Sequence, residues 1–318
     1  MPQIDDLDNP PTFNKQEWIG QKKIYSPKNL PYFVVDACTQ AFAVPQHERW
    51  RFPSRDITVL DLLRTRTPVR SSALNTTKPE AWFSNDPPDI DLETLCTHKI
   101  PSEDYLKKLE GIAGQMWLDG AQSIVDHRVN DGRGRLPLWV LRFWKEMSGI
   151  SQTKADWAKC ERYLSVASPG RSAAVTESFA NASACLEQLG WDTPMSGLDN
   201  LQTTRELTRV IGDGWISTGI IQMMAEHLSA RAKADTKVPA STVITGLHFA
   251  VALLSALDRK LPYTRKKTPL LARYEHDIKN SERKKLYFPA HVNGCHWITV
   301  CIDFANHEYA YGKPFPSY

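Results

Sequence analysis

The chain has 318 residues, 42% of them hydrophobic, and a formal net charge of +3 at pH 7. This length allows about two domains, and the apolar content is sufficient for packed cores. A charge this small excludes a strongly basic protein that binds polyanions over its whole surface. No apolar run approaches the roughly 20 residues that span a bilayer, the first residues form no signal sequence, and the six cysteines are irregularly spaced. We therefore expect an intracellular protein, nuclear or cytoplasmic, with reduced thiols and no membrane partner.

Residues 1–101 are rich in proline and show little sustained periodicity. The first hundred residues hold 11 of the 21 prolines, and pairs such as Pro10-Pro11 and Pro87-Pro88 break helices. We expect extended segments and short elements that lie on the rest of the protein, with partial disorder at the terminus. One short helix is predicted from Thr58 to Arg64, with Thr58 as its N-cap.

Residues 102–200 change to a helical pattern. Apolar side chains recur at helical spacing in four segments, and a proline is acceptable in the first turn of the second one. Aromatic stripes of this kind form cores far more often than ligand sites, so we predict an antiparallel helical bundle. The four apolar faces comprise Tyr105, Leu106, Leu109, Ile112, Ala113 and Met116; Leu136, Trp139, Val140, Phe143, Trp144 and Met147; Trp157, Cys160, Tyr163 and Leu164; and Val175, Phe179, Ala182, Leu186 and Leu189.

The last region, residues 205–318, combines predicted helices with strands. Apolar positions predict one helix from about Thr218 to Arg231 and another from about Ala240 to Arg259. Alternating and β-branched residues from Leu286 to Asp303 predict two strands around a polar turn, and a third strand is predicted at about His307 to Tyr311. In the second strand the predicted faces are Trp297, Thr299 and Cys301 on one side and Ile298, Val300 and Ile302 on the other.

His296 stands at the start of the second predicted strand, next to Trp297. Imidazole titrates near neutral pH and an indole shields its surroundings from water, so the pair suits general-base chemistry. A single histidine in a hairpin is more often an ordinary surface or core residue. The spacing alone leaves both interpretations open. His291 lies five residues earlier across the turn, a spacing at which a metal pair with His296 is conceivable but not expected.

Two motifs, in this order along the chain, resemble the ULP/SENP family, cysteine peptidases that mature SUMO-type modifiers and remove them from targets. The segment from Gly214 to Ile221 is similar to the family's tryptophan box, which a helix follows. The hairpin is similar to the family's central hairpin, and the matching residues are Tyr287-Phe288-Pro289, His296-Trp297, Ile302-Asp303 and Tyr311-Gly312.

The resemblance covers residues 205–318 and implies an α+β fold. A mainly helical N-terminal region would be followed by the N-terminal part of a papain-like, ULP-type cysteine peptidase domain. This arrangement is also loosely similar to fungal ULP-like proteins that carry a long helical region before the domain. The implied reaction is hydrolysis of a ubiquitin-like modifier after its C-terminal Gly-Gly.

The resemblance assigns roles to three residues. It implies that His296 is the general base of a Cys-His-Asp triad, and that Trp215 and Trp297 flank a narrow tunnel for the Gly-Gly tail. Only residues without a Cβ fit between two indoles. For Trp215, an ordinary core position is the alternative. The implied partner is a ubiquitin-like modifier of SUMO type or its conjugates, and we expect neither a cofactor nor a metal ion.

The sequence departs from the family where catalysis needs it most. The family's spacing puts the triad aspartate at Lys313, and a lysine cannot accept the imidazole N–H. The family's nucleophile lies several dozen residues further on, whereas this sequence stops at Tyr318. We therefore expect a truncated domain without peptidase activity, with an exposed sheet edge and a half-covered core that favour aggregation. The alternative function is a non-catalytic module that binds a ubiquitin-like protein or nucleic acid.

Other groups offer little chemistry. The segment from Arg259 to Lys285 is rich in basic residues and tyrosines, which suits phosphate contacts and base stacking. Acidic residues within it favour a solvated connector instead, so nucleic acid is not the expected partner. No cysteine is expected to replace the nucleophile: Cys295 points away from His296, Cys301 lies inside a strand, and Cys38, Cys96, Cys160 and Cys185 are predicted to be small buried hydrophobes.

Overall fold

The computed structural model shows an α+β chain. It forms two compact units, Met1–Ala158 and Lys159–Tyr318, and the division falls inside residues 102–200, for which the sequence predicts a helical bundle. Among the described residues, no helix is both long and apolar enough to cross a membrane. The structure describes residues 17, 24–71, 78–90, 95, 99–127, 134–166, 172–196, 202–211, 215–258, 269–280, 284–294 and 296–312.

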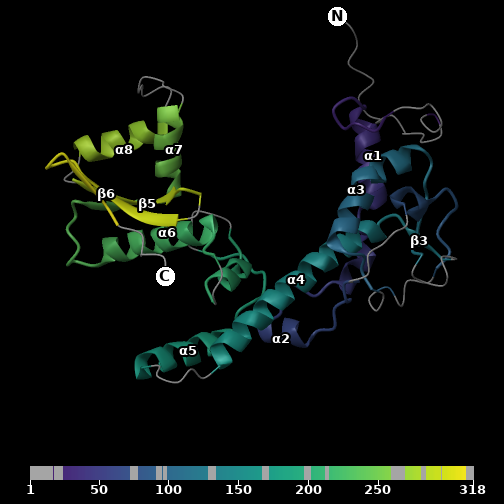
Figure 1. Ribbon diagram of the computed structural model, residues 1–318, viewed down its shortest axis with the longest axis horizontal. Helices are drawn as coiled ribbons and strands as arrows, with labels where there is room; N and C mark the ends of the chain where they lie inside the picture. The colour runs from purple at the N-terminus through teal and green to yellow at the C-terminus, as the bar shows by residue number, and fades with distance from the viewer. Residues whose placement is uncertain are drawn as a thin grey trace, which may run out of the picture. The chain divides into compact units, whose positions relative to one another are not determined.

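Helices and a small sheet make up the described part of the first unit (Figure 1). The antiparallel sheet has the order β1 (Phe83–Ser84), β2 (Ser123–Val125) and β3 (Arg135–Pro137). The α-helices are α1 (Tyr32–Phe42), α2 (Val59–Arg64), α3 (Glu103–Leu118) and the first part of α4 (Val140–Ser165), and the 3-10 helices are η2 (Gln46–Arg51) and η3 (Pro79–Trp82).

The core of the first unit contains side chains from α3, from the start of α4 and from the proline-rich region. Tyr105, Leu106 and Leu109 are buried on one face of α3, as the helical spacing predicts. Trp82, from the proline-rich region, is fully buried. The centroid of its ring lies 5.3 Å from that of Tyr105 and 6.0 Å from that of Trp144. The short elements before residue 101 therefore lie on the helical region, as predicted, and contribute to its core.

The short helix predicted at Thr58 is confirmed as α2. The Thr58 hydroxyl accepts a hydrogen bond from the Asp61 backbone N–H at 3.1 Å and donates to the Asp61 carboxylate at 2.8 Å. Val59 and Leu62 are fully buried. A side-chain cap and a buried apolar face therefore stabilise this single turn and a half together.

Two helical predictions in residues 102–200 are wrong in their boundaries. Leu136 lies in β3, opposite Ile124 of β2, because the preceding strand supplies its backbone partners. The second and third predicted helices are one continuous helix, α4. Ser148 and Thr153 within it are buried, and the Thr153 hydroxyl donates to the Gly149 carbonyl at 3.0 Å. Tertiary burial thus extends the helix over residues of weak helical propensity.

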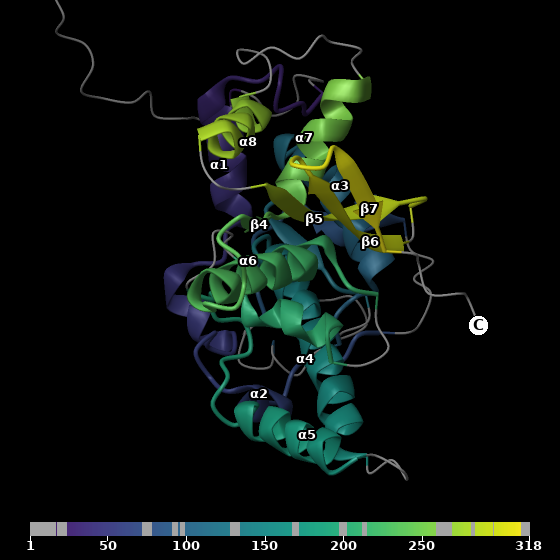
Figure 2. The same cartoon turned by 90° about the vertical axis from the view of Figure 1, so that its left-hand side faces the viewer.

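The described part of the second unit contains a four-stranded sheet in the order β4-β5-β6-β7. Strands β4 and β5 are parallel, and the other neighbours are antiparallel. Figures 1 and 2 show this sheet between α6 on one side and α7 and α8 on the other. The elements are α5 (Ala173–Cys185), η6 (Thr204–Arg209), α6 (Thr218–Ala234), β4 (Thr242–Ile244), α7 (Leu247–Asp258), α8 (Pro269–Asn280), β5 (Lys285–Val292), β6 (His296–Asp303) and β7 (Glu308–Tyr311).

An apolar core lies between the sheet and the helices α7 and α8. Leu286 and Phe288 of β5 are buried against Phe249 of α7 and Leu271 of α8. The Phe249 ring stands edge-on to its neighbours, with its centroid 4.9 Å from that of Phe288 and 5.0 Å from that of Tyr274. This packing covers one face of β5, and the other face of β5 is turned toward α6.

The helix predicted at Thr218 is confirmed as α6, and the Ser217 hydroxyl caps it by accepting from the Ile220 N–H at 3.4 Å. The helix predicted from Ala240 is wrong at its start. Residues Thr242–Ile244 form β4, which pairs in parallel with β5, and the helix begins only at Leu247. The β-branched residues of this short run find their partners some forty residues later, outside any local window.

The cysteine predictions divide into three outcomes. Cys38 and Cys160 are buried, as predicted. Cys185 is exposed at the end of α5, so that prediction is wrong, because α5 has no buried residue. Cys96 and Cys295 lie outside the described residues.

Candidate functional site

The hairpin formed by β5 and β6 carries the predicted site. Its turn contains Asn293 and Gly294, both at positive φ, a conformation that these two residue types adopt at low cost. The resulting register pairs Val292 with His296 and His291 with Trp297. Residues directly opposite each other in a sheet share a face. The predicted alternation of side chains in the second strand is therefore confirmed.

His296 is exposed at the start of β6 and shares a face with Ile298 and Val300. Among the described residues, no hydrogen bond or ion pair involves its imidazole. Cys301 and Asp303 occupy odd-numbered positions of the same strand and so lie on the opposite face. Neither can serve His296 as nucleophile or orienting acid. Lys313, at the position expected for the triad aspartate, lies outside the described residues.

Trp297 lies on the other face of the hairpin, beside the segment that carries Trp215. Its indole N–H donates to the Ile216 carbonyl at 3.2 Å, across 81 positions of sequence. Trp215 is 74% exposed, so the alternative of a core position is wrong. The fold thus brings the two predicted substrate-binding tryptophans into one neighbourhood, and it separates them from the imidazole of His296.

The segment before α6 is anchored at Ile216 and at Ser217. The Trp297 indole N–H donates a hydrogen bond to the Ile216 carbonyl, and the Ser217 hydroxyl donates to the Glu206 carboxylate of η6 at 3.0 Å. A polar network of this kind limits the movement of the chain that carries Trp215. The exposed Trp215 side chain is therefore presented from an anchored backbone.

His291 lies next to Trp297 on the same face of the hairpin, a position that the sequence analysis did not predict for it. Its ring centroid lies 4.5 Å from that of Trp297, with an interplanar angle of 37°. His291 and His296 face opposite sides of the hairpin, so they do not form a metal pair. The length of the turn pairs position 291 with position 297. The turn length could therefore have predicted the contact between His291 and Trp297.

Two further cross-strand pairs lie on the same face of the hairpin as Trp297. Tyr287 faces Cys301, and the hydrogen bond with this thiol, its charge interaction and burial all raise the pKa of Tyr287. Lys285 pairs with Asp303 at 3.2 Å, and the hydrogen bond to Asp303 is the largest cause that raises the pKa of Lys285.

Asp303 also organises the turn between β6 and β7. Its carboxylate accepts from the backbone N–H groups of Ala305 and Asn306 at 3.0 and 3.2 Å. Burial by itself raises the pKa of Asp303, but the hydrogen bonds from Asn306, Lys285 and Ala305 outweigh it and lower that pKa. The ionised carboxylate is therefore part of the folded turn.

The basic segment from Arg259 to Lys285 is described only in part. Lys279 pairs with Glu275, and Lys285 pairs with Asp303, so neither ammonium is a free positive charge. Tyr274 packs on Phe249 and hydrogen-bonds the Thr245 hydroxyl, which makes it a core residue and not a stacking platform. Residues 259–268 and 281–283, which hold the remaining tyrosine and most of the basic residues, lie outside the described part.

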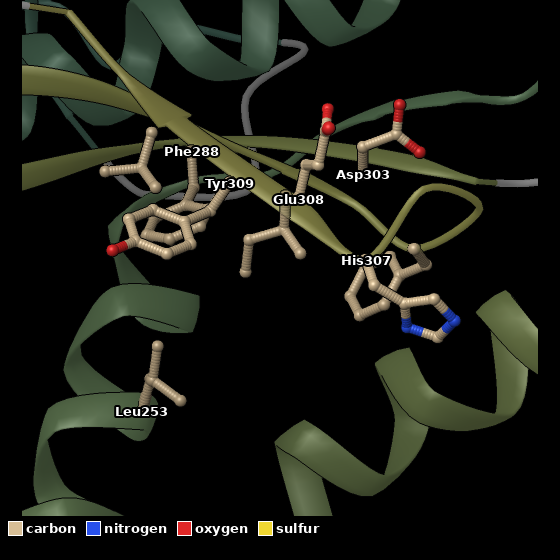
Figure 3. A pocket seen from close by; sticks show the side chains of 9 residues that line it. Leu253, Phe288, Asp303, His307, Glu308 and Tyr309 are labelled. Carbon is tan, nitrogen blue, oxygen red and sulfur yellow. The ribbon is translucent and has the colours of Figure 1, made fainter.

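An open pocket of about 440 Å³ lies on the face of the sheet opposite Trp297. Figure 3 shows Leu253 of α7 across the pocket from Phe288 and Tyr309, while the carboxylates of Asp303 and Glu308 point away from Leu253. Within the described ranges, no three His, Cys, Asp or Glu side chains gather as a metal site would require. The pocket lining comprises Leu253, Phe288, Val300, Ile302, Asp303, Phe304, His307, Glu308 and Tyr309.

Compared with protein-family models, with curated proteins and with solved structures, the chain matched none of them.

Proposed function

We propose that the second unit is a binding module without peptidase activity, which holds the C-terminal Gly-Gly tail of a SUMO-type modifier against Trp215 and Trp297. The observation that carries this proposal is the hydrogen bond from the Trp297 indole to the Ile216 carbonyl, at 3.2 Å. It joins the two motifs that resemble the ULP/SENP family at one place. We propose for the same reason that residues 205–318 follow the N-terminal part of a ULP-type, papain-like fold.

The chemistry of an indole supports a glycine tail as the ligand. Trp215 is largely exposed and therefore available for contact with a ligand. Flat aromatic faces bind an extended backbone closely only where no Cβ intervenes, which selects glycine. His291 packs against Trp297 with its ring tilted by 37°, which supports the indole. The anchored backbone at Ser217 reduces the entropy that binding has to overcome.

The position of His296 supports binding without hydrolysis. Acyl transfer requires a thiolate next to its base. Cys301 and Asp303 lie on the opposite face of the hairpin from His296, and both take part in other cross-strand contacts. The imidazole is therefore available to solvent and not to a described nucleophile.

A binding titration with an immobilised SUMO-type modifier tests the proposal on the full chain. We expect Trp215→Ala to weaken binding about tenfold or more, because an anchoring aromatic contributes on the order of 1–2 kcal/mol. Trp50→Ala is the matched control, since Trp50 is also largely exposed, at 71%, but lies in the first unit. A modifier without its terminal Gly-Gly should bind as weakly as the Trp215 variant. Equal affinities for Trp215→Ala and the unchanged protein would reject the tail-binding role.

A second assay separates binding from catalysis. We expect the full chain to release no product from a modifier whose C-terminus carries a fluorogenic group, and His296→Ala to behave identically. Turnover that disappears in His296→Ala would instead establish a peptidase.

A further inference from the structure

β7 forms one edge of the four-stranded sheet. β7 is the last strand of the sheet, and among the described residues no strand pairs with its outer edge. Edge strands are usually blunted by short length, charged side chains, proline or a bulge. β7 is four residues long and has the sequence Glu308-Tyr309-Ala310-Tyr311, so it contains one charged residue, Glu308, and neither lysine nor proline.

The hydrogen-bond pattern shows which backbone groups face outward. The Gly312 N–H donates to the Thr299 carbonyl at 2.9 Å, so these two residues form a hydrogen-bonded pair of the antiparallel ladder. Such pairs alternate with non-bonded ones, and Ala310 with Cys301 is therefore the next bonded pair. It follows that the N–H and C=O groups of Tyr309 and Tyr311 point away from β6.

The other edge of β6 gives an independent check of this alternation. The Phe304 N–H donates to the Lys284 carbonyl at 2.8 Å, on the side of β5. Even-numbered residues of β6 therefore bond to β5, and odd-numbered residues bond to β7. This agrees with Thr299 and Cys301 as the bonding partners of β7.

We propose that a second copy of this chain pairs its β7 antiparallel with this edge, around a two-fold axis at Ala310. The two four-stranded sheets then form one continuous sheet. Tyr309 lies opposite Tyr311 of the second copy, and each outward N–H meets an outward carbonyl. The proposal is independent of the proposed tail-binding site, which lies elsewhere in the unit.

The residues of β7 are complementary to themselves in this register. Ala310 faces Ala310 of the second copy, and this smallest of side chains suits the closest approach of two antiparallel strands. Glu308 faces Gly312 of the second copy, so no like charges stand opposite each other. Tyr309 of one copy and Tyr311 of the other form an aromatic cross-strand pair. This pair lies on the apolar face of the sheet, beside the pocket that Tyr309 lines (Figure 3).

The area available predicts a weak dimer. Tyr309 and Tyr311 are 76% and 60% exposed. Tyrosines bury roughly 200 Å² each when fully covered, so the two copies together cover on the order of 500 Å² of tyrosine surface. This is well below the ≈ 1,600 Å² of a standard stable interface. We expect a dissociation constant of roughly tens to hundreds of micromolar, characteristic of weak association.

Charge substitution at Ala310 provides the test, by sedimentation equilibrium of the full chain. The average mass of the unchanged protein should rise with concentration from 36.0 kDa toward twice that value. Ala310→Lys and Ala310→Glu each place like charges face to face and should each raise the dissociation constant about fivefold. An equimolar mixture of the two variants should associate roughly tenfold more tightly than either alone, because Lys then faces Glu.

Glu308→Lys is the matched control, because it changes charge on the same face of the same strand without opposing a like charge. It should associate as the unchanged protein does. A mass of 36.0 kDa at every concentration would overturn the proposal. So would a dimer that Ala310→Lys leaves intact, or a Lys and Glu mixture that associates no better than its components.

Discussion

Replacement of Phe288 by alanine measures how strongly the core of the second unit is packed. Phe288 is 4% exposed, and its ring stands at 62° to that of Phe249, with the centroids 4.9 Å apart. Removal of a buried phenylalanine ring costs about 3–5 kcal/mol. Phe288 also lines an open pocket, so the vacated space connects with solvent and does not become a closed cavity. We therefore expect the lower end of this range, about 3 kcal/mol.

Hydrogen exchange of the full chain resolves where that loss acts. A loss of about 3 kcal/mol is roughly a hundredfold in an equilibrium constant, so amides of β5 and β6 should exchange about a hundredfold faster, or lose protection altogether. Amides of α3 belong to the other compact unit and should keep their rates. The matched variant is Phe143→Ala, because Phe143 is fully buried in the first unit and should give the reverse pattern.

Two results would refute this reasoning. If exchange in β5 and β6 rises less than about threefold in Phe288→Ala, the ring contributes little to the core, and the packing against Phe249 is overestimated. If α3 accelerates as much as the hairpin does, the two units do not unfold separately.

Two further predictions concern single contacts of the second unit. Gly246→Ala should destabilise by about 1–3 kcal/mol in denaturant titrations. The reason is that an added Cβ collides with the Gln222 side chain, whose oxygen accepts from the Leu247 N–H at 2.8 Å at the start of α7. Gly149→Ala, in the open on α4, is its control and should be neutral or slightly stabilising. For Asp303, the lowered pKa means that its carboxylate stabilises the fold above the ordinary pKa and that this contribution is lost as the pH falls through the folded value. The melting temperature of Asp303→Asn should therefore lie below that of the unchanged protein at neutral pH, and the difference should shrink in acid; a constant difference would exclude the linkage.

Elements whose information is local could be predicted from the sequence. The hairpin follows from alternating apolar residues around Asn293 and Gly294, which specify both strands and their register. The caps at Thr58 and Ser217 satisfy backbone N–H groups within three residues, so α2 and the start of α6 were predictable. Even the division of side chains between the two faces of β6 followed from the period of two.

Elements that depend on partners elsewhere in the chain could not be predicted from local patterns. β4 has only three residues and becomes a strand because β5, about forty residues later, pairs with it. Leu136 lies in β3 because Ile124 of the preceding strand, β2, pairs with it. Local propensity cannot predict such pairing, because the backbone hydrogen bonds and burial that stabilise it come from elsewhere in the chain.

The candidate site, too, could be predicted from the sequence only in part. The sequence pointed to His296, Trp215 and Trp297 through a resemblance of motifs, but no pattern along the chain states which side chains meet. The fold joins Trp297 to Ile216 and adds His291, while it turns His296 to the opposite face from Cys301. Chemistry requires atoms within a few ångströms of each other, and only the packing of strands and helices decides which residues reach that distance.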